Sequence, residues 1–241
     1  MSKQRIDTLL VARGLVDSRE KARVMIMGGA VIANSRTVIK PNTLVGEDAA
    51  IHLIQSPPYV GRGGLKLEGA LDRFQIDVAS KVAVDVGAST GGFTDCLLKR
   101  GATRVYAVDV GYGQLDYRLR QDPRVVVMER SNARYPFTLP ELADLATVDV
   151  SFISLEKVVP TVADVVKSNG ELIVLVKPQF EAGREQVGKG GVIRDPLVHA
   201  SVLGRFCNWA IDHNFRLRDL VTSPLPGADG NREFFVRLQK R

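Results

Sequence analysis

The spacing of hydrophobic and polar positions changes along the chain. From residue 82 onward, short apolar runs rich in β-branched residues alternate with stretches in which apolar residues recur every three or four positions. The runs are typical of buried strands and the stretches of helices. Their alternation predicts an α/β fold with a mostly parallel, doubly wound sheet. We expect strands near 82–86, 104–109, 124–128, 146–151 and 171–176, and helices near 62–74, 91–100, 114–120, 155–168 and 196–212.

The C-terminal part departs from this alternation. Two apolar stretches, near 216–222 and 232–238, flank a segment rich in proline and glycine. Such a segment between two strands predicts a turn, so we expect a C-terminal antiparallel hairpin beside the parallel strands.

The first 54 residues have a different pattern, typical of a small α+β unit. Ser18 is placed as the N-cap of a helix that ends near Met27. The other expected elements are a helix over 3–13 and short strands near 30–33, 37–39 and 50–54. The segment 55–64 is rich in proline and glycine and predicts a linker. We therefore divide the chain into residues 1–55, a linker at 56–64, and residues 65–241.

Charge is concentrated at the N-terminus. The chain has 241 residues and a net charge of +6, and residues 1–40 contain eight Lys or Arg against three Asp or Glu. A small basic unit predicts contact with a nucleic-acid backbone, although a solvated helix face would have the same charge. Two distant cysteines and the lack of an apolar leader or membrane-length run favour a reducing, cytoplasmic location.

The stretch 82–98 contains the strongest chemical signal. An apolar strand is followed by Gly87, Gly91 and Gly92 and then by the start of a helix. Glycines at this place let a ligand approach the backbone, and the spacing is not that of NAD enzymes. Asp85 adds a carboxylate that suits a ligand with an amino group, such as S-adenosylmethionine. A dinucleotide site and a glycine-rich packing turn are the alternatives.

Ligands in such sheets bind at the carboxyl ends of the strands, which points to further residues. Asp109 follows the second strand at the position that accepts ribose hydroxyls. Asn132 follows the third strand and is placed to meet an adenine edge. Asp149 and Lys177 end the fourth and fifth strands. Lys66 lies at the margin of the apolar stripe of its helix, and the alternative to a role in the site is an ordinary solvated lysine. For Lys177 the alternative is a lysine whose side chain extends from the strand end to solvent.

Four of these positions resemble a known set. Lys66, Asp149, Lys177 and Glu233 are similar in order and placement to the Lys-Asp-Lys-Glu tetrad of ribose 2′-O-methyltransferases with the FtsJ-type fold. Residues 3–55 resemble the S4-type RNA-binding domain. The combination, with the motifs GRGGLKLEGAL, DVGASTGGFTDCLL, LVKPQFE and NREFF, resembles the TlyA family of rRNA methyltransferases, which are often labelled hemolysins.

The resemblance implies a Rossmann-like methyltransferase domain after an S4-type domain. It implies S-adenosylmethionine as methyl donor and, as acceptor, the 2′-hydroxyl of a ribosomal cytidine, within an assembled ribosomal subunit. No metal, DNA or membrane is expected. The expected catalytic residues are Lys66, Asp149, Lys177 and Glu233. The expected donor-binding residues are Asp85, Gly87, Ser89, Gly91, Gly92, Phe93, Asp109 and Asn132. The expected RNA-binding residues are Arg5, Arg19, Arg23, Arg62, Arg184 and Lys189.

Two alternative functions are kept. One is an RNA-binding protein whose methyltransferase fold is inactive. The other is a membrane-lytic protein, which would need an amphipathic or membrane-spanning segment; the sequence shows no such segment.

Overall fold

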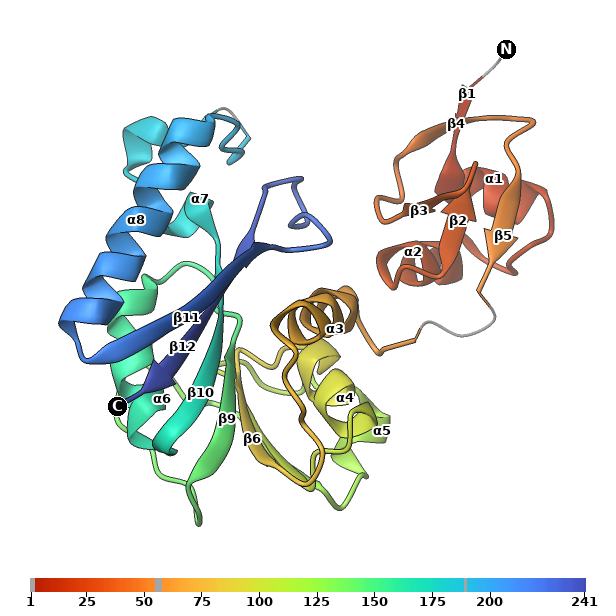
Figure 1. The fold of residues 1–241 in the computed structure, drawn as a ribbon. Coiled ribbons are helices and arrows are strands. Elements are labelled where there is room, and N and C mark those ends of the chain that lie inside the picture. The colour runs from red at the N-terminus through yellow and green to blue at the C-terminus, as the bar shows by residue number, and fades with distance from the viewer. Residues whose placement is uncertain (1–2, 55–57, 189) are drawn as a thin grey trace.

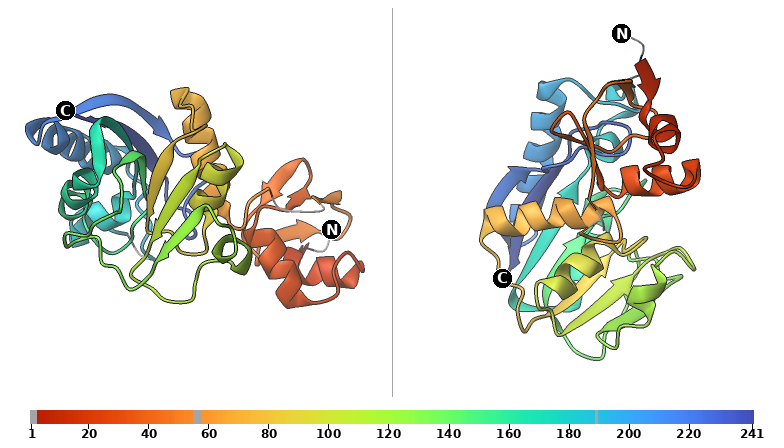
Figure 2. Two further views of the ribbon diagram at one scale, coloured as in Figure 1. Left: turned by 90° about the horizontal axis from the view of Figure 1, so that it is seen from below. Right: turned by 90° about the vertical axis from the view of Figure 1, so that its right-hand side faces the viewer.

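The chain folds into a small N-terminal domain and a larger domain built on a twisted sheet (Figure 1). The computed structural model describes residues 3–54, 58–188 and 190–241. In the views of Figures 1 and 2 the small domain lies on the side of the large domain that carries helix α3.

The small domain packs two helices against short strands around a core that includes Ile6, Leu10 and Ile26. The Ser18 side chain accepts a hydrogen bond from the backbone N–H of Lys21, so it caps the second helix as predicted. The elements are β1 (Lys3–Arg5), α1 (Ile6–Ala12), α2 (Arg19–Met27), β2 (Val31–Ala33), β3 (Arg36–Val38), β4 (Leu44–Gly46) and β5 (Ile51–Leu53).

The predicted helix over 3–13 is wrong at its start. Residues 3–5 form β1, which pairs antiparallel with β4, and α1 begins only at Ile6. β4 has three residues, too few for a pattern of alternating polarity to predict it. The β1–β4 pairing adds backbone hydrogen bonds that the helical spacing of residues 3–13 did not anticipate.

The large sheet has seven strands in the order β11-β12-β10-β9-β6-β7-β8. The strands from β10 to β8 are parallel, whereas β12 pairs antiparallel with both β10 and β11. The predicted sheet and its C-terminal hairpin are therefore confirmed. The strands are β6 (Val82–Val86), β7 (Arg104–Val108), β8 (Val125–Met128), β9 (Ala143–Val148), β10 (Val166–Val176), β11 (Phe215–Thr222) and β12 (Phe234–Lys240).

Helices cover both faces of this sheet (Figure 2). One face packs against α3 (Arg62–Phe74) and α4 (Gly92–Lys99), and the other against α6 (Val159–Asp164) and α8 (Pro196–Asp212). Shorter helices are α5 (Tyr117–Arg120) and α7 (Pro178–Glu181), with 3₁₀ turns at Leu155–Lys157 and Arg184–Gln186. None of the helices in the described residues is both long and apolar enough to cross a membrane.

Several helix and strand predictions need correction. The helix expected over 155–168 is a 3₁₀ turn followed by the short α6, and β10 already begins at Val166. Val166 is buried and pairs with Ala143, so burial in the sheet prevails over helical spacing. The helix expected over 114–120 contains only Tyr117–Arg120. The fourth strand spans Ala143–Val148, and Asp149 follows it.

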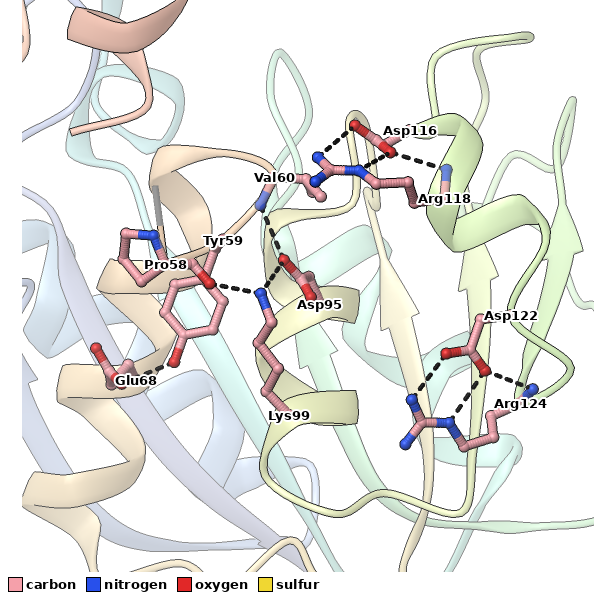
Figure 3. A network of polar contacts seen from close by, with 10 residues as sticks. All are labelled: Pro58, Tyr59, Val60, Glu68, Asp95, Lys99, Asp116, Arg118, Asp122 and Arg124. Atoms are coloured by element: carbon pink, nitrogen blue, oxygen red, sulfur yellow. Dashed lines mark hydrogen bonds and ion pairs between the residues drawn. The ribbon is translucent and has the colours of Figure 1, made fainter. Parts of the chain in front are cut away.

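The chain enters the large domain through a segment held by polar contacts (Figure 3). Tyr59 donates its hydroxyl to Glu68 of α3 at 2.7 Å, and the backbone N–H of Val60 donates to Asp95 of α4 at 2.9 Å. Lys99 donates to Asp95 and to the carbonyl of Pro58. Helix α3 begins at Arg62, within the last part of the segment 56–64 that the sequence predicts as a linker.

The centre of the sheet should be the least tolerant place for truncation. We expect Leu172→Ala, at a fully buried position of β10, to lower the free energy of unfolding by about 2–5 kcal/mol, because it leaves a cavity between packed layers. Leu197→Ala, on the exposed side of α8, should change it by less than about 0.5 kcal/mol. Urea denaturation of both variants measures the difference, and equal losses would contradict this view of the core.

Candidate active site

Two adjoining cavities open at the carboxyl edge of the parallel strands. The first has a volume of about 450 Å³ and the second of about 370 Å³. Because five residues line both cavities, the two cavities adjoin and form one cleft. The shared residues are Gly87, Ser89, Asp149, Ser151 and Phe152.

Gly87 brings two strand ends together. It directly follows β6, and its backbone has a φ of +84°, which glycine adopts without strain. A Cβ atom at this residue would lie 2.2 Å from the backbone oxygen of Asp149. Only glycine therefore allows the turn after β6 to lie against the segment after β9, and this approach joins the two cavities.

A second glycine contact places Lys66. Helices α3 and α4 meet at their N-terminal ends, where a Cβ atom on Gly92 would lie 3.0 Å from the backbone nitrogen of Gly64. A Cβ atom on Gly63 would lie 3.1 Å from the ring of Phe93. Because these positions lack side chains, α3 lies close enough for Lys66, one turn further along, to line the first cavity.

The four residues of the tetrad come together in the first cavity as two pairs of opposite charge. Lys66 Nζ lies 2.6 Å from Glu233 Oε2, and both side chains are buried. Lys177 Nζ lies 2.5 Å from Asp149 Oδ1 in a more open part of the cavity. Isolated charges at these depths would be costly, so each carboxylate stabilises the lysine beside it. Each lysine of the tetrad therefore has a carboxylate partner within the cavity.

Asp85 does not lie where the sequence placed it. Its side chain is fully buried and lines neither cavity. Oδ2 accepts a hydrogen bond from the Thr94 hydroxyl at 2.7 Å and Oδ1 from the Thr147 hydroxyl at 2.9 Å. The alternation of a strand turns Asp85 toward α4 and away from the cleft. Through these two hydrogen bonds Asp85 connects β6 to α4 and β9, and its side chain is not exposed to the cleft. Burial raises the pKa of this carboxyl to about 7, and the negative charge of Asp149 acts in the same direction.

The other expected donor-binding residues mostly line the cleft. Ser89, Gly92 and Phe93 line the first cavity, and Asp109 and Asn132 line the second. Asp109 accepts backbone hydrogen bonds from Ser89 and Gly111, both at 2.7 Å, which holds its carboxylate at the cavity wall. Gly91 lines neither cavity. It is the N-cap of α4, with a φ of +96° and no room for a side chain beside Leu119.

The arginines expected to bind RNA are divided between the two domains. Arg5 and Arg19 both donate to the buried carboxylate of Asp7, and these bonds, led by that of Arg5, lower the pKa of Asp7 to about 2. This carboxylate therefore orients two guanidinium groups at the surface of the small domain. Arg23 is exposed on α2.

In the large domain, Arg62 lines the first cavity. Arg184 is exposed in a 3₁₀ turn and lines neither cavity. Lys189 lies outside the residues that the structure describes.

Three residues of the site were not anticipated. Ser151 accepts a hydrogen bond from Lys177 Nζ at 2.9 Å. Phe152 is 89% exposed at the cavity mouth, and its ring lies 4.6 Å from that of Phe180. Asn231 is buried and bonds the backbone of Gly191 and Ile193, which holds the loop before Glu233. A polar residue shortly after an apolar strand, two positions beyond Asp149, was the available signal for Ser151. Nothing local pointed to the contacts of Asn231.

The sheet order, the glycine turn and the cleft at the carboxyl edge define a Rossmann-like domain of the methyltransferase type. Comparison with protein families agrees with this class. The model of the FtsJ-like methyltransferase family matches residues 59–240, and that of the S4 domain matches residues 4–51. The chain belongs to the FtsJ-like methyltransferases, within the family that includes TlyA, and carries an S4 domain at its N-terminus.

Individual relatives cover almost the whole chain. TlyA of Mycobacterium tuberculosis, named as a 16S/23S rRNA (cytidine-2'-O)-methyltransferase, is 44% identical over 98% of this chain and 89% of its own length. Hemolysin A of Brachyspira hyodysenteriae is 41% identical over 97% of this chain and 99% of its own. A solved structure of a Streptococcus thermophilus protein has a TM-score of 0.76 at 43% identity, covering 100% of this chain and 89% of that one.

The raised pKa of Asp85 makes a prediction about stability. Between about pH 4 and about pH 7 the unfolded chain ionises this carboxyl while the folded chain keeps its proton. The free energy of unfolding contributed by Asp85 is therefore present below pH 4 and is lost as the pH rises through 7. Asp85→Asn cannot ionise, so its stability relative to the wild type should increase across this window.

Urea denaturation of both proteins at several pH values measures this effect. Asp77→Asn, at an exposed position after α3, serves as the control and should follow the wild type at every pH. Parallel curves for the wild type and Asp85→Asn would show that folding does not raise the pKa of Asp85.

Proposed function

We propose that this chain transfers a methyl group from S-adenosylmethionine to the ribose 2′-hydroxyl of a ribosomal RNA nucleotide, a cytidine as in the name of its TlyA relative. The observation that carries the proposal is the gathering of two lysine–carboxylate pairs in one cavity, beside the glycine turn. A ribose hydroxyl is a weak nucleophile, and this cavity offers two cations at one place to orient its oxygen.

The second cavity suits the nucleoside part of the donor. Its walls include the apolar side chains of Val110, Ile153 and Val158, which fit an adenine ring. The Asp109 carboxylate is placed to accept ribose hydroxyls, and Asn132 is placed at the base edge. The donor carries its methyl group on a positively charged sulfur. The junction of the two cavities, at Gly87 and the Asp149 carboxylate, suits this sulfonium end of the molecule.

The first cavity suits the acceptor. Lys177 is the more accessible lysine, and it orients the 2′-oxygen and stabilises its developing negative charge. Its second role requires the neutral amine, which takes up the proton that the hydroxyl releases when the oxygen–carbon bond forms. Lys66, held by Glu233, adds positive charge deeper in the cavity. The exposed Phe152 and the half-buried Phe180 offer aromatic faces on which a nucleobase stacks.

The RNA surface is proposed to extend from the cleft to the small domain. Arg62 lies in the cavity wall, and Arg5, Arg19 and Arg23 lie on the S4 domain. Cations that neutralise phosphates release counterions and supply much of the affinity for RNA. Arg184 and Lys189 remain expected contacts from the large domain.

Lys177→Ala tests the chemistry. We expect it to abolish transfer of labelled methyl groups to separated ribosomal subunits, because the acceptor oxygen loses the cation that orients it. Lys157→Ala, an exposed lysine near the same edge, should transfer at the wild-type rate. Mapping the labelled nucleotide identifies the site. Undiminished transfer by Lys177→Ala would contradict the tetrad assignment, and a wild type that binds RNA but no donor would favour an inactive fold.

Arg23→Gln tests the RNA surface of the small domain. Loss of one phosphate contact should reduce the slope of log affinity against log salt by about 0.7–0.9. Arg216→Gln, exposed on the edge strand β11, is the matched control and should leave the slope unchanged. Filter binding to rRNA at several salt concentrations measures both slopes, and equal slopes for the two variants would place the RNA elsewhere.

A further inference from the structure

Ser151 stands where the two cavities meet. It lies two residues after Asp149, lines both cavities, and its hydroxyl is exposed to the cleft. Its Oγ accepts a hydrogen bond from Lys177 Nζ at 2.9 Å. Ser151 is not part of the lysine–carboxylate tetrad, yet it contacts the lysine that is nearest to the acceptor.

The contacts of Lys177 with Ser151 and Asp149 differ in kind. Asp149 Oδ1 lies 2.5 Å from Lys177 Nζ, but it accepts no well-aligned hydrogen bond from any group in the described residues. Ser151 Oγ, by contrast, accepts a hydrogen bond from Lys177 Nζ at 2.9 Å. Asp149 therefore holds the lysine by its charge at short range, and Ser151 gives the same amine a second, separately placed acceptor with good hydrogen-bond geometry.

The backbone around Ser151 is built to hold this contact. Phe152, the next residue, has a φ of +63°, a conformation that a bulky residue adopts only when its surroundings impose it. Its ring packs on Phe180 of α7. Glu181, at the end of α7, accepts hydrogen bonds from the Ser154 hydroxyl at 2.9 Å and the Leu155 N–H at 2.8 Å.

These contacts tie the segment after β9 to the segment after β10. Ser151 and Lys177 belong to these two segments and are thus held at a constant separation.

We infer that Ser151 is a positioning residue that aims the Lys177 amine at the acceptor oxygen. An amine rotates freely about its last carbon–nitrogen bond unless a partner fixes one N–H. With one N–H on Ser151 and a second position of the amine turned toward Asp149, the third position faces the cavity. That position carries an N–H when Lys177 is protonated and a lone pair when it is neutral, so the same geometry serves both roles of the lysine.

This inference rests on the proposed methyl transfer and is tested in the same assay. Ser151→Ala should lower kcat about tenfold, the effect of losing one orienting hydrogen bond to a charged group. The KM values for donor and RNA should stay within about twofold, because Ser151 acts through Lys177 and not through ground-state binding. Ser151→Thr retains the hydroxyl and should restore kcat to within about twofold.

Two further variants complete the design. Ser151→Cys keeps the side-chain size with a weaker acceptor, and its kcat should fall with that of Ser151→Ala. Ser201→Ala, exposed on α8, is the matched control and should leave kcat unchanged. Thermal unfolding of each variant is measured in parallel, and because Ser151 is exposed, its variants should unfold at the wild-type temperature.

The outcomes separate this inference from the proposed function. If the wild type methylates neither ribosomal subunit, the proposed function fails. If the wild type methylates RNA and Ser151→Ala does so at the same kcat, only the role of Ser151 is overturned. A rise in the donor KM at unchanged kcat would also overturn it, since Ser151 would then bind the donor. A Ser151→Thr variant as slow as Ser151→Ala would show that the hydroxyl is not the group that matters.

Discussion

The close backbone approach of Gly87 to Asp149 is the constraint on which the site depends. A side chain at residue 87 would collide with the Asp149 carbonyl, so neither strand end could keep its place. The approach merges the two cavities and sets Asp149 at their junction. The contact between Asp149 and Lys177 then follows, because β9 and β10 are neighbours in the sheet. A defect at one glycine would therefore reach the proposed donor site and the acceptor site together.

Charge balance is the second organising feature of the cleft. Two lysines share one cavity, and each is offset by its own carboxylate. The two pairs are not equivalent. Lys66 and Glu233 are both buried, which makes their pair a rigid support whose disruption would leave a charge without a partner. Lys177 and Asp149 are more exposed, so Lys177 can replace part of its contact with Asp149 by a contact with the substrate.

The accuracy of the sequence-based predictions depended on how local the determining forces are. The helix at 62–74 and the strand at 82–86 have the bounds that periodicity predicted, because each has a clear stripe or an uninterrupted apolar run. The helix expected over 155–168 was wrong, because pairing with β9 draws Val166 into the sheet. The placement of Asp85 beside the cleft overlooked a local rule, the alternation of side chains along β6, and its hydroxyl partners Thr94 and Thr147 became visible only in the folded chain.

The sequence by itself determined the order of the main strands and helices of the large domain, the glycines of the turn after residue 86, and the order of the Lys-Asp-Lys-Glu residues along the chain. These are properties of residue type and short-range spacing. Only the tertiary structure decided which carboxylate holds which lysine and that the Ser151 hydroxyl accepts a hydrogen bond from the Lys177 amine. Lys66 and Glu233 are 167 residues apart, and their contact depends on side-chain distances that arise once the helices have packed on the sheet.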